Sequence, residues 1–362
     1  MKSIKSNVAV ILLPLLLALA ALLAGLWAGL FRLGWAIPAL SGSLIEYHGA
    51  LMVSGFLGTL ITLERVVALR RRWMFAAPLL TGAGWVASLL FPAIALGPAL
   101  ITLGSLVGVL ILWVIVRREP ALHTFTLETG AACWLAGNLL WVSGMPVLRI
   151  VFWWMAFLVL TIAGERLELS RVLKMTRQKR LLFLLAAGIF LTGVIVTVLN
   201  LGLGERIAGL GMVALALWLI FFDLARRNLR HPVPLTRYIA RCLYAGYFWL
   251  GVSGLLALWI GSVFGGPLYD AVLHSLFIGF VLSMIFGHAP IILPAFLKRP
   301  LPYRPSFTLN LALLHASLLV RIAGDLGGWQ TVRQWGGLFN AISLLLFLGL
   351  MVAALRGRKK AA

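Results

Sequence analysis

The stretch DAVLHSLFIGFVLSMIFGHAPIILPAF, residues 270–296, decides the fold, because it is apolar for more than twenty residues and yet carries two histidines. A run of this length is long enough to cross a bilayer as one helix. His274 and His288 are fourteen residues apart, and at about 100° per residue they return to within about 40° of one direction. Both imidazoles are therefore expected on one face of a membrane helix, where an ionisable residue indicates a functional site.

The composition of the whole chain agrees with that of an integral membrane protein. Of its 362 residues, 62% are hydrophobic and 11% are charged, which lies far outside the usage of soluble domains. The net charge of +21 does not indicate nucleic acid, because the basic residues form short clusters between apolar runs. The two cysteines, Cys133 and Cys242, fall in different predicted helices and provide neither a disulfide framework nor a Cys-x-x-Cys metal site.

The sequence predicts an all-α integral membrane protein with twelve transmembrane helices in a single polytopic domain, residues 1–362. The expected spans are 8–31, 44–69, 75–91, 94–116, 121–143, 147–169, 181–200, 204–224, 238–262, 267–296, 306–324 and 334–355. A short similarity among the ends of spans two, six and ten is consistent with three pseudo-repeated blocks of four helices.

The distribution of positive charge predicts the orientation. Of the 31 Lys and Arg residues, 26 fall on alternate connections and on the two termini, and the remaining connections hold five. Cytoplasmic connections of membrane proteins carry the excess of Lys and Arg. Both termini are therefore expected in the cytoplasm, and the protein is expected in the cell (inner) membrane, with the lipid bilayer as its surroundings.

This orientation sorts four histidines by depth. His48 and His274 are expected near the outer ends of spans two and ten, and His288 and His315 in the inner halves of spans ten and eleven. Haem bound by two histidines needs two neutral imidazoles at equal depth on facing helices, and Gly49, Gly55, Gly58 and Gly279 provide small neighbours. The alternatives are that the glycines only allow close helix packing and that each histidine hydrogen-bonds a neighbour.

The inner pair allows a second metal site. The spacing on span ten fits two haems stacked across the membrane, so His288 and His315 are candidate ligands for a second haem or metal. Alternatively, His288 satisfies a backbone carbonyl that Pro290 or Pro294 leaves without its helical partner. Glu128, inside span five, is a candidate proton-handling residue, and a buried hydrogen bond is the alternative.

Two arginines are predicted near the outer histidines. Arg321 and Arg333 are the outer arginines nearest in sequence to the histidine-bearing spans, and the planar guanidinium group suits carboxylates such as haem propionates. Arg321 and Asp325 are also spaced for an i,i+4 ion pair on span eleven.

These features resemble two related groups of membrane proteins. HGALMVSGF at the start of span two, twelve spans and a histidine near the outer end of span ten resemble haem–copper oxidase subunit I. The segments GHAPIILPAFLKRPLPY and LLVRIAGDL are more similar to the NnrS family, membrane proteins of nitric oxide metabolism that contain haem and copper. The resemblance covers most of the chain in topology.

The resemblance implies haem ligands at His48 and His274, propionate contacts at Arg321 or Arg333, and a b-type haem. It also implies a second haem or copper as a further cofactor, with nitric oxide or a redox protein as a partner. The chain departs from the oxidases in its sixth span, which offers Trp153, Trp154 and Glu165 in place of the copper-binding histidine and the tyrosine. The oxygen-reducing copper site therefore cannot form in that way.

Three function classes follow from the sequence. The first is a haem protein of the NnrS type, acting in nitric oxide handling or membrane electron transfer. The second is a secondary transporter without haem, because twelve spans and polar residues at mid-membrane depth are common there. The sequence argues against transport in that helix-breaking segments do not recur in matched halves. The third, an assembly subunit without chemistry, leaves four membrane histidines unexplained.

Overall fold

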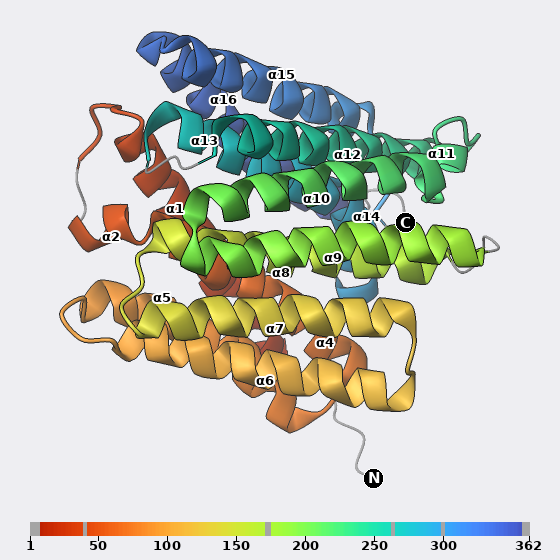
Figure 1. The fold of residues 1–362 in the computed structure, drawn as a ribbon, viewed down its shortest axis with the longest axis horizontal. Helices are drawn as coiled ribbons and strands as arrows, with labels where there is room; N and C mark the ends of the chain where they lie inside the picture. The colour runs from red at the N-terminus through yellow and green to blue at the C-terminus, as the bar shows by residue number, and fades with distance from the viewer. Residues whose placement is uncertain (1–7, 39–41, 171–174, 262–264, 298–300, 357–362) are drawn as a thin grey trace. The chain divides into compact units, whose positions relative to one another are not determined.

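The computed structural model describes residues 8–38, 42–170, 175–261, 265–297 and 301–356. Within these ranges the chain is helical and contains no β-strand. The helices are α1 Val8–Arg32, α2 Gly42–Glu46, α3 His48–Ala50, η1 Leu51–Gly58, α4 Thr59–Leu69, η2 Arg72–Phe75, α5 Ala76–Leu90, α6 Leu96–Arg118, α7 Leu122–Val142, α8 Val147–Leu169, α9 Arg177–Leu199, α10 Leu201–Phe222, α11 Ala225–Asn228, α12 Pro234–Ile260, α13 Gly266–His274, η4 Ser275–Leu282, α14 Ser283–Leu297, α15 Pro305–Gly327 and α16 Gln330–Arg356. Figure 1 shows their course.

Membrane-length helices dominate the fold. Among the described residues, eleven stretches are long and apolar enough to cross a bilayer. The all-α class is thus confirmed, and the protein is a multi-pass membrane protein. The fifth predicted span coincides with the 21-residue helix α7, which is not one of the eleven, so the count of twelve stays a prediction.

The chain separates into two compact units, residues 1–164 and 165–362, called here the N-terminal and C-terminal units. The boundary falls near the end of α8 (Val147–Leu169). The predicted spans one to five and most of span six belong to the N-terminal unit, and spans seven to twelve belong to the C-terminal unit. The proposed three blocks of four helices are not tested by this division and stay a prediction.

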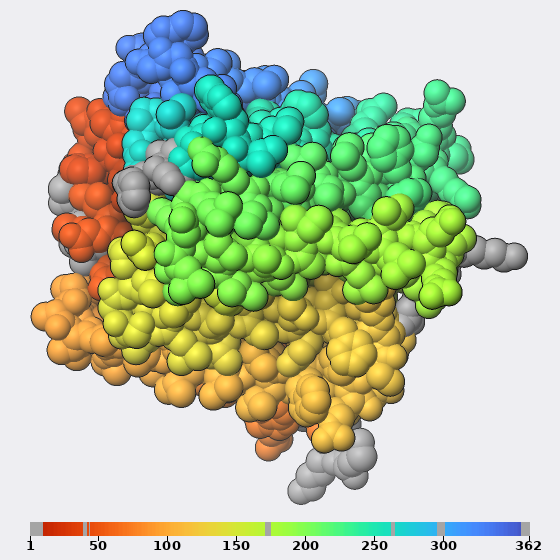
Figure 2. All heavy atoms as spheres, in the orientation of Figure 1, coloured from red at the N-terminus to blue at the C-terminus, as the bar shows by residue number. Residues whose placement is uncertain are grey.

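Helix pairs in each unit pack closely because glycines face the partner backbone. In the C-terminal unit, Asn200 alone joins α9 to α10, and its side chain caps α10 by accepting from Leu203 N at 3.0 Å. A Cβ on Gly204 would lie 2.3 Å from Thr197 N, and one on Gly211 would lie 2.3 Å from Phe190 N. Small residues at such contacts let membrane helices approach, and side chains close the remaining space between α9 and α10 (Figure 2).

The two spans that carry the outer histidines are not regular α-helices. Span two includes α2, α3, the π-helix η1 and α4, and span ten consists of α13, the π-helix η4 and α14. The angle of about 40° between His274 and His288 assumes α-helical geometry throughout. That assumption is wrong, because the eight residues of η4 lie between the two histidines and are π-helical.

Candidate functional site

His48 sits in a notch on α1. Its Nδ1 lies 2.8 Å from Gly25 O, and a Cβ on Gly29 would lie 3.0 Å from the ring atom Cε1. The absence of a side chain at Gly29 therefore lets the imidazole lie against the α1 backbone. A carbonyl only accepts, so Nδ1 is the donor and carries the proton. The lone pair of the neutral ring is then on Nε2, which is the arrangement that backbone carbonyls impose on many metal-binding histidines.

His274 has the same tautomer for a different reason. It is the last residue of α13, and its Nδ1 lies 2.9 Å from Asp270 O one turn earlier and 3.1 Å from the Asp270 carboxylate oxygen Oδ1. Its Nε2 lies 3.2 Å from Arg321 Nη2. Because a guanidinium only donates, Nε2 accepts this hydrogen bond and the neutral ring carries its proton on Nδ1.

Both histidines precede a π-helix of eight residues. His48 begins α3, which is followed by η1 (Leu51–Gly58), and His274 ends α13, which is followed by η4 (Ser275–Leu282). These are the two π-helices within the described ranges. Segments of π-helix are rare and occur frequently at functional sites. The distortion thus marks the same two histidines that the sequence predicted as outer ligands.

His274 and four other ionisable side chains form what we call the ion cluster: Asp270, His274, Arg321, Asp325 and Arg333. Arg321 Nη2 and Arg333 Nη2 donate to Asp270 Oδ2 at 2.7 and 3.1 Å, and Arg333 Nε donates to Asp325 Oδ1 at 2.5 Å. The side chains of Asp325 and Arg321 are 0% and 8% exposed. Two carboxylates and two guanidiniums balance the charge, which removes most of the penalty for burying it.

The packing of α15 against α16 places the two arginines side by side. A Cβ on Gly324 would lie 2.5 Å from Arg333 N, and one on Gly336 would lie 2.4 Å from Arg321 N. Each arginine therefore stands opposite a glycine of the neighbouring helix. This reciprocal contact fixes the depth of both guanidinium groups along the helix pair and directs them to Asp270.

His315 uses both ring nitrogens within the protein. Trp249 Nε1 donates to Nδ1 at 3.0 Å, so the neutral ring carries its proton on Nε2, which lies 3.3 Å from Ser283 Oγ. Ser283 Oγ in turn donates to Cys242 O at 2.7 Å. This chain of hydrogen bonds suits a structural histidine. His288 lies on α14 and is partly buried. The metal-binding role of both residues stays a prediction.

The structure brings some predicted site residues together. His274 and Arg321 are in direct contact, and Arg333 joins them through Asp270. The expected i,i+4 pairing of Arg321 with Asp325 is wrong in its partners, because Asp325 bonds Arg333 and Arg321 bonds Asp270. No role for Asp270 was predicted, although its i,i+4 spacing to His274 could have indicated one. His48 belongs to the N-terminal unit, and the other predicted haem-site and metal-site residues belong to the C-terminal unit.

No group of three or more His, Cys, Asp or Glu side chains within the described ranges is arranged to hold a metal ion. A metal bound by protein side chains alone is thus not indicated there. A haem differs, because its porphyrin supplies four ligands and the protein needs to provide only one or two axial groups.

The comparisons with known proteins identify a family. A model described as a domain of unknown function, DUF8744, matches residues 10–356, which is nearly the whole chain. No curated protein matches the sequence.

Proposed function

This chain belongs to the DUF8744 family, and we propose that it is a haem-binding membrane protein of the NnrS type. Its role on this proposal is nitric oxide handling or electron transfer in the membrane. The observation that supports it best is the shared state of His48 and His274. Each ring holds its proton on Nδ1 through a backbone carbonyl, so each carries the lone pair on Nε2, and each stands before a π-helix.

The chemistry of the two neutral imidazoles suits axial ligation of a b-type haem, which would supply one-electron chemistry when bound. His48 and His274 would provide the imidazoles. Arg321 Nη2 donates to His274 Nε2, so iron binding at His274 requires the guanidinium to release that nitrogen. Arg321 and Arg333 would then be the donors for the haem propionates. Both already bond carboxylates, those of Asp270 and Asp325, which shows that their geometry suits such groups.

A second haem or copper at His288 and His315 has less support than the first haem. His315 donates and accepts within the C-terminal unit, so we propose a structural role for it. A second haem or copper at His288 would then need a different partner. Changing His315 to alanine should leave the metal content unchanged, and loss of one metal equivalent would contradict this assignment.

The proposed topology is twelve spans across the cell (inner) membrane, with both termini in the cytoplasm. The alternating distribution of Lys and Arg supports it, with α7 as the fifth span. Reporter fusions at the two termini and at the connection between α12 and α13 test it. The termini should report cytoplasm and the connection should report the outside, and an external terminus would overturn the topology.

The visible absorption spectrum of the purified protein, oxidised and then reduced with dithionite, tests the haem proposal. Two imidazole ligands should give a low-spin spectrum with sharp reduced bands, because two strong nitrogen donors complete the six-coordinate iron. Expression with added haem precursor excludes an artefact of limited supply. A purified, folded protein without haem absorption under these conditions would overturn the proposal.

The second candidate function is a secondary transporter without haem, and the ion cluster favours it. Ionisable residues within membrane spans often mark substrate or ion pathways, and four charged side chains here lie on three spans. Each unit contains one π-helix, so an irregular helical segment does recur in the two units, as is common in transporters. A spectrum without haem, together with uptake into proteoliposomes, would favour this function.

A further inference from the structure

Glu128 is an acidic residue of the N-terminal unit that the candidate haem site does not use. It lies on α7, six residues after Leu122, which places it about 9 Å along the helix from the end that the proposed topology puts at the cytoplasm. Its carboxyl oxygen Oε2 is buried and has no hydrogen-bond partner among the described residues. The buried hydrogen bond that the sequence allowed as an alternative role is therefore not found at this oxygen.

The burial of the Glu128 carboxyl group is not offset by a nearby charge. No charged side chain in the described part of the chain lies close enough to do so. The nearest histidine and the nearest charged residue in the sequence are His123 and Glu119, at the start of α7 and before it. Asp270 and Asp325, by contrast, bond arginines. A carboxyl group buried without a partner usually avoids the cost of a lone charge by taking up a proton.

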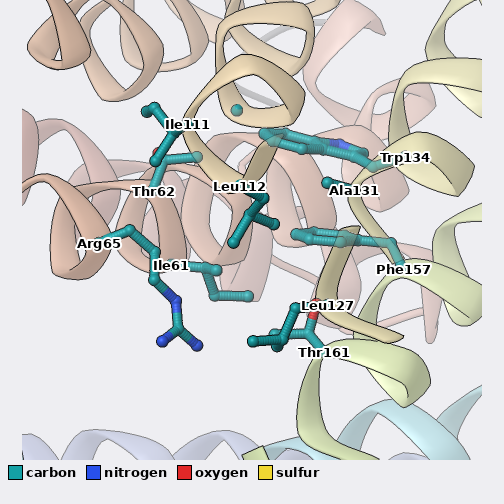
Figure 3. A pocket seen from close by; sticks show the side chains of 11 residues that line it. Ile61, Thr62, Arg65, Ile111, Leu112, Leu127, Ala131, Trp134, Phe157 and Thr161 are labelled. Atoms are coloured by element: carbon teal, nitrogen blue, oxygen red, sulfur yellow. The ribbon is translucent and has the colours of Figure 1, made fainter. Parts of the chain in front are cut away.

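The face of α7 that carries Glu128 lies at the surface of the chain. Phe125 and Ala132 stand three residues before and four residues after Glu128, on the same face of the helix, and both are exposed. The other side of α7 faces the interior, where Trp134 stacks on Phe157 of α8 with ring centroids 4.7 Å apart (Figure 3). In the proposed topology, the surface beside Glu128 therefore meets lipid.

The charge on Glu128 also affects how well α7 suits a bilayer. Helix α7 occupies the place of the fifth predicted span but is not among the eleven stretches that are apolar enough to cross. It contains one acidic residue, Glu128, and no Lys or Arg. Its buried Asn138 is held by Trp154 Nε1, which donates to Oδ1 at 3.0 Å. A proton on Glu128 would thus remove the one carboxylate charge that opposes insertion of this helix.

We propose that Glu128 is a proton-binding site within the bilayer, with a carboxyl group that is protonated at neutral pH and open to lipid. The buried Oε2 without a partner, the absence of a nearby cation and the exposed neighbours Phe125 and Ala132 carry this proposal. It goes beyond the haem function and depends on α7 crossing the membrane. A membrane carboxyl group without a fixed partner can exchange its proton when its surroundings change, as the acidic residues of proton relays do.

Infrared spectroscopy of the purified full chain tests the protonation state. The spectrum of Glu128→Gln at neutral pH, compared with that of the wild type, should lack the carbonyl stretch of one protonated carboxyl group and should keep every carboxylate band. Glutamine is neutral and has nearly the shape of protonated glutamate, so this variant should fold as the wild type does. Loss of a carboxylate band instead, or failure of Glu128→Gln to fold, would show that the ionised form is present and would overturn the proposal.

A lipid-soluble carbodiimide tests the access from lipid. In the reaction of dicyclohexylcarbodiimide with a carboxylic acid, the acid proton moves to one nitrogen of the reagent and the carboxyl oxygen bonds to its central carbon. The acyl group then shifts to the other nitrogen, so the whole reagent is added and nothing leaves. Peptide mass spectrometry of the protein in detergent micelles should find this adduct on Glu128, and Glu128→Gln should abolish it.

Glu46 is the matched control, because its side chain is exposed on α2. It should react with a water-soluble carbodiimide and an amine, and should not react with dicyclohexylcarbodiimide. Glu128 should show the opposite preference. Reaction of Glu128 with the water-soluble reagent alone would place it in water and overturn the proposal, as would a protonated Glu128 that reacts with neither reagent, because it would not be open to lipid. No haem spectrum enters these measurements, so this proposal and the haem proposal can fail separately.

Discussion

His48 and His274 have the same tautomer and each precedes a π-helix, but their surroundings differ in charge. His48 in the N-terminal unit lies against the bare backbone of α1 at Gly25 and Gly29. His274 in the C-terminal unit contacts Asp270 through Nδ1 and Arg321 through Nε2. The first histidine is oriented by shape and one hydrogen bond, and the second by a network of charges.

The difference indicates a division of labour between the two candidate ligands. A carboxylate beside the distal nitrogen of an imidazole raises its basicity and strengthens it as a ligand. Such a partner is present at His274 through Asp270 Oδ1. The surroundings of His48 should therefore mainly position its imidazole ring. The ion cluster should position the His274 ring and also raise the basicity of that ring. The following predictions separate these roles, beginning with the largest expected effect.

Removing either imidazole should have the largest effect. In the haem proposal, His48→Ala and His274→Ala each delete one axial ligand, so the purified variants should lose haem or show a high-spin spectrum. His315→Ala is the matched control, because it removes a histidine that is already satisfied by Trp249 and Ser283. Unchanged low-spin spectra in both single variants would show that neither histidine binds the iron.

Breaking the ion cluster should cost more stability than removing an exposed carboxylate of the N-terminal unit. Asp325→Ala leaves Arg333 with one carboxylate, that of Asp270, which it shares with Arg321, and we expect the free energy of unfolding to fall by about 3 kcal/mol. Glu46→Ala, at an exposed position before His48, should change it by less than about 0.5 kcal/mol. Unfolding in mixed detergent micelles measures both, and equal values would contradict a structural role for the cluster.

Adding a methyl group at the helix contacts should disturb the two surroundings in different ways. Gly324→Ala forces backbone atoms of α15 and α16 apart, because the nearest atom is Arg333 N at 2.5 Å, and should destabilise the protein by about 2 kcal/mol. Gly29→Ala meets a side chain, the His48 ring at 3.0 Å, and should cost about 1 kcal/mol or less. Thermal unfolding in detergent measures both losses of stability. A larger loss for Gly29→Ala than for Gly324→Ala would contradict the greater cost expected at the backbone contact.

The smallest expected effect is on the reduction potential. Arg321→Gln removes a positive charge beside His274, which should disfavour the reduced haem by about 1 kcal/mol. The midpoint potential should therefore fall by about 40 mV for one electron. Arg32→Gln is the counterpart near His48, because Arg32 reaches Ile45 O at 3.4 Å and is solvent-accessible. Its shift should be smaller, since exposed charges are screened. Potentiometric titration that gives equal shifts would contradict the proposed division of labour.

The sequence predicted much of the fold and only part of the site. Hydropathy located eleven of the twelve expected spans within a few residues, and α7 occupies the place of the remaining one. The proximity of Arg321 to His274 followed from their common expected depth. The π-helices were not predicted, because local composition gives no signal that distinguishes eight π-helical residues from an α-helix in an apolar run.

The partners of the charged groups were also beyond the sequence argument. Asp325 and Arg321 have the spacing of an intrahelical pair, yet Arg321 bonds Asp270 on another helix. A guanidinium chooses among several carboxylates by geometry, and that geometry depends on how closely Gly324 and Gly336 let α15 approach α16. Spacing along one helix therefore gave the right residues and the wrong pairs.

The sequence by itself determined the helical class and the membrane-length spans, because hydropathy acts on each segment separately. Only the tertiary structure decided the tautomers of His48 and His274, the ion cluster around Asp270, and the stacking of Trp134 on Phe157. These features need side chains that are remote in the sequence to meet within hydrogen-bond or van der Waals distance. Such meetings are fixed by packing between helices, which no single segment specifies.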